Sequence, residues 1–94
     1  MIIIAGSLRV AAGDRSRYLT AVADVALLAR RSAGCLDFVQ AADPLDPERI
    51  HVFERWETDE DVERFRTSGG PELDLPPLLS ADVHKYRIAA VEPP

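Results

Sequence analysis

The sequence predicts an α+β fold of the ferredoxin-like βαββαβ type, with a four-stranded antiparallel sheet. Short β-branched or alternating segments are typical of strands, and two longer segments with apolar residues at helical spacing are typical of helices. The predicted strands are residues 2–10, 35–42, 49–57 and 82–91, and the predicted helices are residues 14–32 and 58–67. Right-handed crossovers then place both helices on one face of the sheet and leave the other face uncovered.

The first predicted helix follows the first strand after Gly13 and Asp14. Asp14 can cap this helix, since its carboxylate can accept a hydrogen bond from a free backbone N–H. Apolar residues then recur at intervals of three and four, at Tyr18, Leu19, Val22, Val25, Ala26 and Ala29. The helix ends at Ala33-Gly34, because glycine adopts the left-handed terminal conformation without steric cost.

Three further signals divide the second half of the chain. The two prolines and two aspartates in residues 43–47 predict a hairpin loop between the second and third strands. Thr58 can cap the second helix, and the three acidic residues that follow favour its first turn. The pair Pro76-Pro77 prevents a regular helix in the leucine-rich segment 73–79, so we expect an irregular, lid-like loop there.

Length and charge exclude several classes of protein. The 94 residues form one domain, residues 1–94, and the net charge of −5 disfavours binding to nucleic acid or to an anionic membrane surface. The single Cys35 excludes an internal disulfide and favours a reducing compartment. With no secretory signal and no apolar stretch of membrane-spanning length, we expect a cytoplasmic protein that is not embedded in a membrane.

The third strand has two different faces. Alternation places one set of side chains, Ile50, Val52, Glu54 and Trp56, opposite the other set, His51, Phe53, Arg55 and Glu57. Pattern alone leaves open which set faces the helices. Either choice leaves apolar side chains on the uncovered face, and exposed apolar surface is unfavourable in water. We therefore expect a homodimer in which two sheets cover each other.

The residues resemble a known family, the antibiotic biosynthesis monooxygenase (ABM) domain proteins, which include quinol monooxygenase-like members. The resemblance spans nearly the whole chain and is most specific at residues 54–58, Glu-Arg-Trp-Glu-Thr. Three further segments match, namely Gly13 with Tyr18-Leu19, Gly34-Cys35-Leu36 and residues 46–49. It implies a dimeric α+β barrel with a pocket between the sheet and the helices of each subunit. It also implies oxygenation of small aromatic compounds, such as phenols, quinols or polyketides, without flavin, haem or metal.

The candidate site follows from this resemblance. Trp56 would form a wall of the pocket, although a core role is equally open for so large a side chain. The substrate is expected to contact Trp56, Phe65, Arg66, Tyr18 and Phe38. His51 is the preferred base for a phenol proton, because histidine titrates near neutral pH, and an interfacial or simply hydrogen-bonded role is its alternative. His84 is expected to be solvated.

No cofactor is expected. Phosphate-binding glycine motifs are missing, and two histidines on separate strands make a weak metal site. Haem-degrading relatives carry an iron-ligating histidine about where Arg66 falls, and arginine cannot ligate iron, so haem degradation is disfavoured. Two other functions remain open on the same fold, a non-catalytic dimer that binds a small ligand and an isomerase or lyase of a small ring metabolite.

Overall fold

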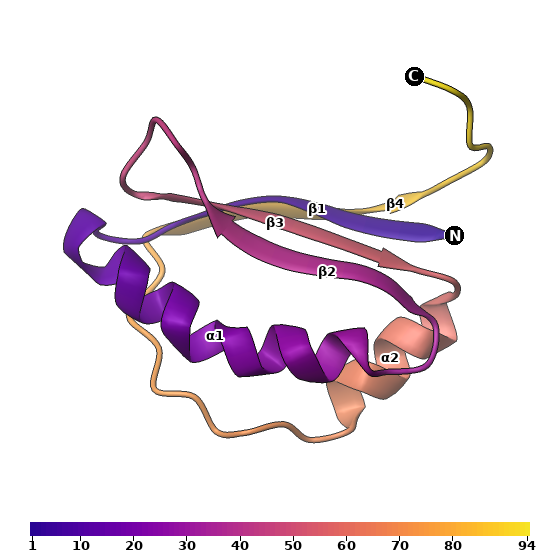
Figure 1. Ribbon diagram of the computed structural model, residues 1–94, viewed down its shortest axis with the longest axis horizontal. Helices are drawn as coiled ribbons and strands as arrows, with labels where there is room; N and C mark the ends of the chain where they lie inside the picture. Colours follow the sequence, from indigo (N-terminus) through magenta and orange to yellow (C-terminus); the bar gives the residue numbers. More distant parts are fainter.

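The computed structural model describes residues 1–94 and has the predicted order of elements (Figure 1). The elements are β1 (Ile2–Arg9), α1 (Arg15–Arg30), β2 (Cys35–Ala42), β3 (Arg49–Trp56), α2 (Asp59–Thr67) and β4 (Ser80–Arg87), with a 3-10 turn at Ala12–Asp14 before α1. The sheet order is β2-β3-β1-β4, and every neighbouring pair is antiparallel. The ferredoxin-like prediction is confirmed. Neither helix is long and apolar enough to span a membrane.

Two predictions of detail were wrong, the end of the last strand and the capping bond of Asp14, although Asp14 does occupy the N-cap position of α1. The last strand was expected at residues 82–91 but ends at Arg87, because its only neighbour, β1, begins at Ile2 directly opposite Arg87. One more backbone bond joins Ile88 to Met1, and the remaining residues project from the sheet on the side away from the helices (Figure 1). The carboxylate of Asp14 makes no capping bond to a backbone N–H and instead accepts from Arg17, at 3.3 Å.

Both helices lie on one face of the sheet, as predicted (Figure 1). Ile50, Val52 and Trp56 are buried on that face, so His51 and Phe53 lie on the uncovered face, and Phe53 is 38% exposed. Two clusters of buried side chains fill the space under the helices. The first cluster is Ile2, Ile4, Ala29, Phe38, Trp56 and Val62, and the second is Leu8, Val10, Tyr18, Val22, Ile50 and Val52.

The predicted loops are also present. The hairpin loop between β2 and β3 is held by Arg15, whose guanidinium donates to the carbonyls of Asp43 and Asp46 at 3.2 and 2.6 Å. Thr58 caps α2 by accepting from the backbone N–H of Asp61, at 3.2 Å. Residues 69–79 have no helix or strand and run along the helix layer from α2 to β4 (Figure 1). Leu73 of this segment packs against the second cluster.

Two glycines allow close contacts that any side chain would obstruct. Gly6 in β1 has φ +153°, and a Cβ there would lie 1.9 Å from the carbonyl oxygen of Asp82 in β4. Gly34, in the turn after α1, has φ +80°, and a Cβ there would lie 2.0 Å from the Asp61 carboxylate in the first turn of α2. The contact between β1 and β4 and the contact between the α1 turn and α2 therefore both depend on glycine.

Replacing Gly6 by alanine should reduce the free energy of unfolding by about 1–3 kcal/mol, because the new methyl group forces backbone atoms of β1 and β4 apart. The matched control is Gly13→Ala, since a Cβ at Gly13 would have no heavy atom within 4 Å. Urea denaturation followed by circular dichroism measures both. Equal unfolding midpoints for the two variants would show that the strands absorb the methyl group without strain.

Candidate functional site

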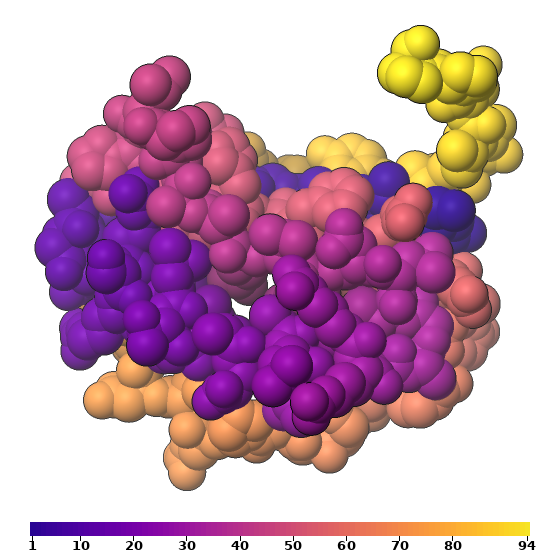
Figure 2. Space-filling view, viewed as in Figure 1, coloured from indigo at the N-terminus to yellow at the C-terminus, as the bar shows by residue number.

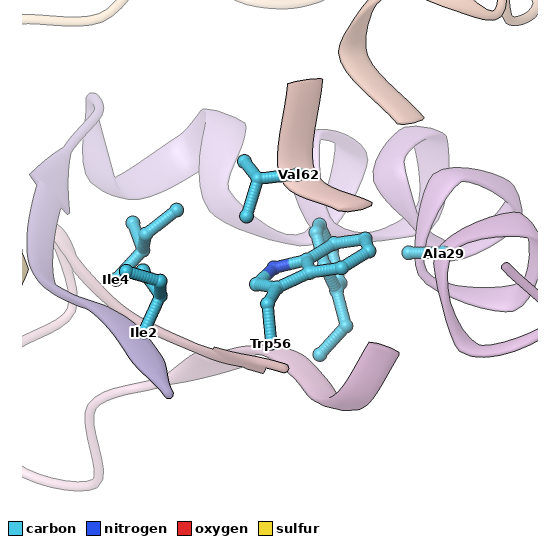
Figure 3. Close-up of a cluster of buried hydrophobic side chains, with 6 residues drawn as sticks. Ile2, Ile4, Ala29, Trp56 and Val62 are labelled. Atoms are coloured by element: carbon cyan, nitrogen blue, oxygen red, sulfur yellow. The ribbon is translucent and has the colours of Figure 1, made fainter. Parts of the chain in front are cut away.

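The candidate site is built around Trp56, the last residue of β3. Its side chain faces the helices and is fully buried, and its indole lies between Val62 of α2 and Ala29 of α1 (Figure 3). The indole Nε1 donates a hydrogen bond to Oε1 of Glu54, at 3.0 Å. Glu54 reaches the same face because it lies two residues earlier on the strand. An acidic group is thus held in the apolar layer by a single indole donor.

Two further aromatic rings surround this pair. Phe65 of α2 lies 5.5 Å from Trp56 between ring centroids, with the planes tilted by 33°. Phe38 of β2 meets Phe65 edge to face, at 6.1 Å and 67°. These three rings come from β2, β3 and α2, so packing of the helix on the sheet is what assembles them. Trp56 and Phe38 are buried, so Phe65, which is partly exposed, is the ring of this cluster on which a planar ligand could stack.

Burial raises the pKa of the Glu54 carboxyl, because the charged form loses contact with water. The hydrogen bond from Trp56 and the positive charge of Arg66 act in the opposite direction and favour the carboxylate. A carboxyl whose pKa is raised is better suited to accept and return a proton near neutral pH than an ordinary glutamate. Glu54 is therefore the residue of this layer with the clearest acid–base chemistry.

Arg66 lines two of the hollows beside α2. The larger, of about 570 Å³, lies on the side of Lys85, and only one of its lining residues, Val62, is apolar. The smaller, of about 280 Å³, lies between α1 and the residues that follow α2; it is lined by Val25, Leu28, Ser32, Phe65, Arg66 and residues 68–71. An aromatic ligand fits the smaller hollow better, since three apolar side chains line it and Phe65 also contacts Trp56.

The structure brings together four of the six residues that the sequence suggested for the site. Trp56, Phe65 and Phe38 are in contact, and Arg66 lies close enough to Glu54 to affect its pKa. Tyr18 lies apart from them, in the second cluster, where burial raises the pKa of its hydroxyl.

The two residues suggested as catalytic lie on opposite faces of the sheet. His51 is on the uncovered face, where its Nε2 contacts Asp43 Oδ2 at 2.5 Å, and this contact contributes to the lowered pKa of Asp43. His84 is exposed on the same face and bonds Asp82 at 2.8 Å. The helix layer therefore contains no imidazole that could ligate a haem iron or take a proton from a ligand beside Trp56. No group of three or more potential metal-ligating side chains comes together.

Glu54 was not among the candidate site residues. The signal that could have found it is its position, because alternation groups this carboxylate with Ile50, Val52 and Trp56. A charged residue on the apolar face of a strand requires a partner or a function, and here its partner is the indole of Trp56.

The comparisons with known proteins agree with this fold. The model of the antibiotic biosynthesis monooxygenase family matches residues 1–71. No curated protein matches the sequence at a significant level.

Several solved structures share the fold over almost the whole chain. A proposed antibiotic biosynthesis monooxygenase from Deinococcus radiodurans has a TM-score of 0.78 and 17% identity, covering 99% of this chain and 97% of that one. Another from Chloroflexus aurantiacus has a TM-score of 0.67 and 23% identity, covering 98% and 96%. The heme degrader MhuD from Mycobacterium tuberculosis has a TM-score of 0.70 and 19% identity, covering 99% and 100%. At these identities, the similarity establishes the fold.

Proposed function

Because the chain belongs to the antibiotic biosynthesis monooxygenase family, we propose that it is a monooxygenase that oxygenates a small, electron-rich aromatic substrate without a bound cofactor. The candidate substrates are phenols, quinols and polyketide-type rings. The observation that carries the proposal is the Glu54–Trp56 pair, a carboxyl of raised pKa held beside three aromatic rings. This arrangement offers a base beside an aromatic cluster whose Phe65 ring lines the smaller hollow.

The chemistry requires only a proton acceptor and a shielded site. Glu54 takes a proton from the substrate hydroxyl or activated carbon, and the resulting phenolate or enolate passes one electron to dioxygen. The two radicals combine to form a carbon–oxygen bond, and Glu54 returns its proton to the resulting peroxide anion. The O–O bond of this hydroperoxide then breaks with loss of water and leaves a new carbonyl group. One oxygen atom enters the product and the other leaves as water, so no external reductant is consumed.

Each side chain has a separate part in this proposal. Trp56 holds one carboxylate oxygen of Glu54 and leaves the other free to accept the substrate proton. Phe65 stacks on the substrate ring from the smaller hollow, and Phe38 supports Phe65 from behind. Arg66, which lines the same hollow, stabilises the substrate anion after the proton has moved. The apolar layer excludes water from the reactive carbanion or radical.

The direct test is oxygen consumption by the purified protein with a panel of hydroquinones and anthrones. We expect uptake above the spontaneous rate and formation of the hydroxyquinone from a hydroquinone, or of the anthraquinone from an anthrone, with one oxygen atom of the product derived from dioxygen. Product formed equally well under nitrogen would contradict the proposal and indicate an isomerase. A raised melting temperature with the same panel and no oxygen uptake would instead indicate a binding protein.

The proposal includes a homodimer formed through the uncovered sheet faces, in a reducing cytoplasm that keeps Cys35 as a free thiol. The uncovered face carries Ile3, Ala5, Val39, Phe53 and Tyr86 in adjoining cross-strand positions. Tyr86 is 50% exposed and Phe53 is 38% exposed, although both are large and apolar. A second copy would remove this surface from water and close a barrel between the two sheets.

Replacing Phe53 by lysine should convert the dimer to a folded monomer. The new ammonium group would be buried without a partner at the centre of the interface, which should raise the dimer dissociation constant by about 100-fold or more. The control is Leu45→Lys, since Leu45 is 93% exposed in the hairpin loop and should not affect the dimer. Light scattering after size exclusion, at micromolar concentration, measures both masses. A wild-type protein that is a stable monomer would overturn the dimer proposal.

A further inference from the structure

The smaller hollow beside α2 contains a single charged side chain. Nine residues line it, at the border between α1 and the segment that follows α2, which lie side by side in Figure 2 (purple and orange). Arg66 is the only one of the nine that carries a charge. The larger hollow differs, because three acidic and three basic side chains line it and their charges balance. The smaller hollow therefore presents one positive charge, in a chain whose net charge is −5.

The guanidinium of Arg66 has no acidic partner in the chain. The other two cations that line the hollows beside α2 are paired. Arg64 donates to Asp61 Oδ1 at 2.8 Å. Lys85 donates to Asp59 Oδ1 at 2.9 Å. Arg66 takes part in none of the ion pairs of the structure, so its charge is available to a ligand.

The position of this charge distinguishes Arg66 from an ordinary surface arginine, which usually contacts only water. Arg66 directly follows Phe65, the ring that lines the same hollow. Its positive charge acts on the Glu54 carboxyl, so the guanidinium lies near the proposed base. A ligand in this hollow would therefore meet an aromatic ring and a cation together, close to Glu54.

The other polar side chains of the hollow, two serines, already use their donors. Ser32 Oγ donates to the carbonyl of Leu28 at 3.0 Å, and Ser68 Oγ donates to the carbonyl of Phe65 at 2.7 Å. Both carbonyls lie near the C-terminal end of a helix, where partial negative charge opposes an anion, and these bonds reduce that effect. Arg66 therefore provides the only side-chain donors of the hollow that are not already used.

From these observations we infer that the aromatic substrate of this site carries a carboxylate group, which binds Arg66 while the ring lies on Phe65. The inference rests on the proposed function, because it takes the smaller hollow as the substrate site. A guanidinium and a carboxylate can form two parallel hydrogen bonds, which fix the orientation of the ring as well as adding affinity. The guanidinium has further N–H donors, which remain for the charge that develops on the ring during the reaction.

The test compares two hydroquinones of nearly equal shape, 2,5-dihydroxybenzoate and 2,5-dihydroxybenzamide, of which only the first is charged. Backbone amide shifts of residues 25–32 and 65–70 are followed by NMR during titration of the whole protein without oxygen. We expect saturable shifts in both segments and an affinity about tenfold higher for the carboxylate, the effect of a charge-assisted hydrogen bond. This preference should shrink in about 0.5 M salt, which screens the charges. The absence of saturable shifts, or equal affinity for both probes, would overturn the inference.

Variants then assign the preference to one side chain. Arg66→Gln should equalise the two affinities, and Arg66→Glu should reverse their order, because its carboxylate repels the charged probe. Both variants should fold, since Arg66 is exposed. Arg17→Gln is the matched control, because it removes the same charge at the far end of α1, outside the hollow, and should leave the preference unchanged. Retention of the preference in Arg66→Gln would show that Arg66 does not bind the carboxylate.

Oxygen uptake with the same two probes separates this inference from the proposed function. Preference for the carboxylate without any uptake would support the anion site and overturn the monooxygenase. Uptake with equal affinity for both probes would overturn the anion site and support the monooxygenase.

Discussion

Replacing Glu54 by glutamine should lower the rate of aromatic oxygenation by about 10²- to 10⁴-fold, which is the usual contribution of a positioned general base. Glutamine keeps the shape of the side chain and an oxygen that can accept from Trp56 Nε1, but it cannot take a proton. Oxygen uptake with the best substrate of the panel measures the effect. Glu57→Gln is the matched control, because Glu57 is exposed just beyond β3.

The pH dependence gives this prediction a second, independent check. The wild-type rate should rise with pH through the raised pKa of Glu54, because only the carboxylate can act as base, and the variant should lack this rise. A variant that retains the wild-type rate and profile would remove Glu54 from the mechanism.

Glu54→Gln should not lower the stability of the fold, in contrast to its effect on the reaction rate. A carboxyl whose pKa is higher in the folded than in the unfolded chain stabilises the fold below the unfolded pKa, and this contribution is lost as pH rises through the folded pKa. At pH 7, burial of the Glu54 charge therefore opposes folding, and Glu54→Gln should be at least as stable as wild type. The urea midpoint of Glu54→Gln should exceed that of the wild type at pH 7, and this difference should shrink toward acid pH. Functional sites often retain a buried ionisable group even though its burial lowers the stability of the fold.

Replacing Trp56 by alanine should destabilise the fold by about 3–5 kcal/mol, because it removes the largest fully buried side chain and leaves a cavity between α1, α2 and the sheet. This is a large part of the roughly 5–15 kcal/mol available to a typical domain. The variant should unfold at a much lower urea concentration and lose the bond that holds Glu54.

Trp56→Phe separates packing from hydrogen bonding. It keeps an aromatic ring against Phe65 but has no donor, so it should retain most of the stability while slowing oxygenation. If Trp56→Ala instead folds with the wild-type urea midpoint and loses only ligand binding, the indole is a pocket wall and contributes little to the core. The full burial of Trp56 favours the first outcome.

The order of elements could be predicted because each element carries its own local signal. Prolines and aspartates mark the hairpin loop, Gly34 ends α1, and Thr58 begins α2. The end of β4 could not be predicted, because Val91 continues the alternating pattern although no residue of β1 is left to pair with it. Strand length here is set by the neighbouring strand, and the sequence of β4 alone does not contain that information.

The candidate site was predictable only in part. Trp56, Phe65 and Phe38 are large apolar residues of different elements that the shared core brings together. The face occupied by His51 was undecided, because the two faces of β3 both carry large apolar side chains. The importance of Glu54 depends on its depth under α2 and on the bond from Trp56, which are tertiary features.

The close approach of Gly34 to Asp61 has a consequence for the proposed substrate site. The turn after α1 and the first turn of α2 touch at this point, so the spacing between the two helices is fixed at one end. A larger residue at position 34 would act as a wedge that tilts α2 outward and carries Phe65 and Arg66 with it. Engineering of bulkier aromatic specificity could therefore begin at this turn, with compensating changes at Asp61, while the reacting groups are left untouched.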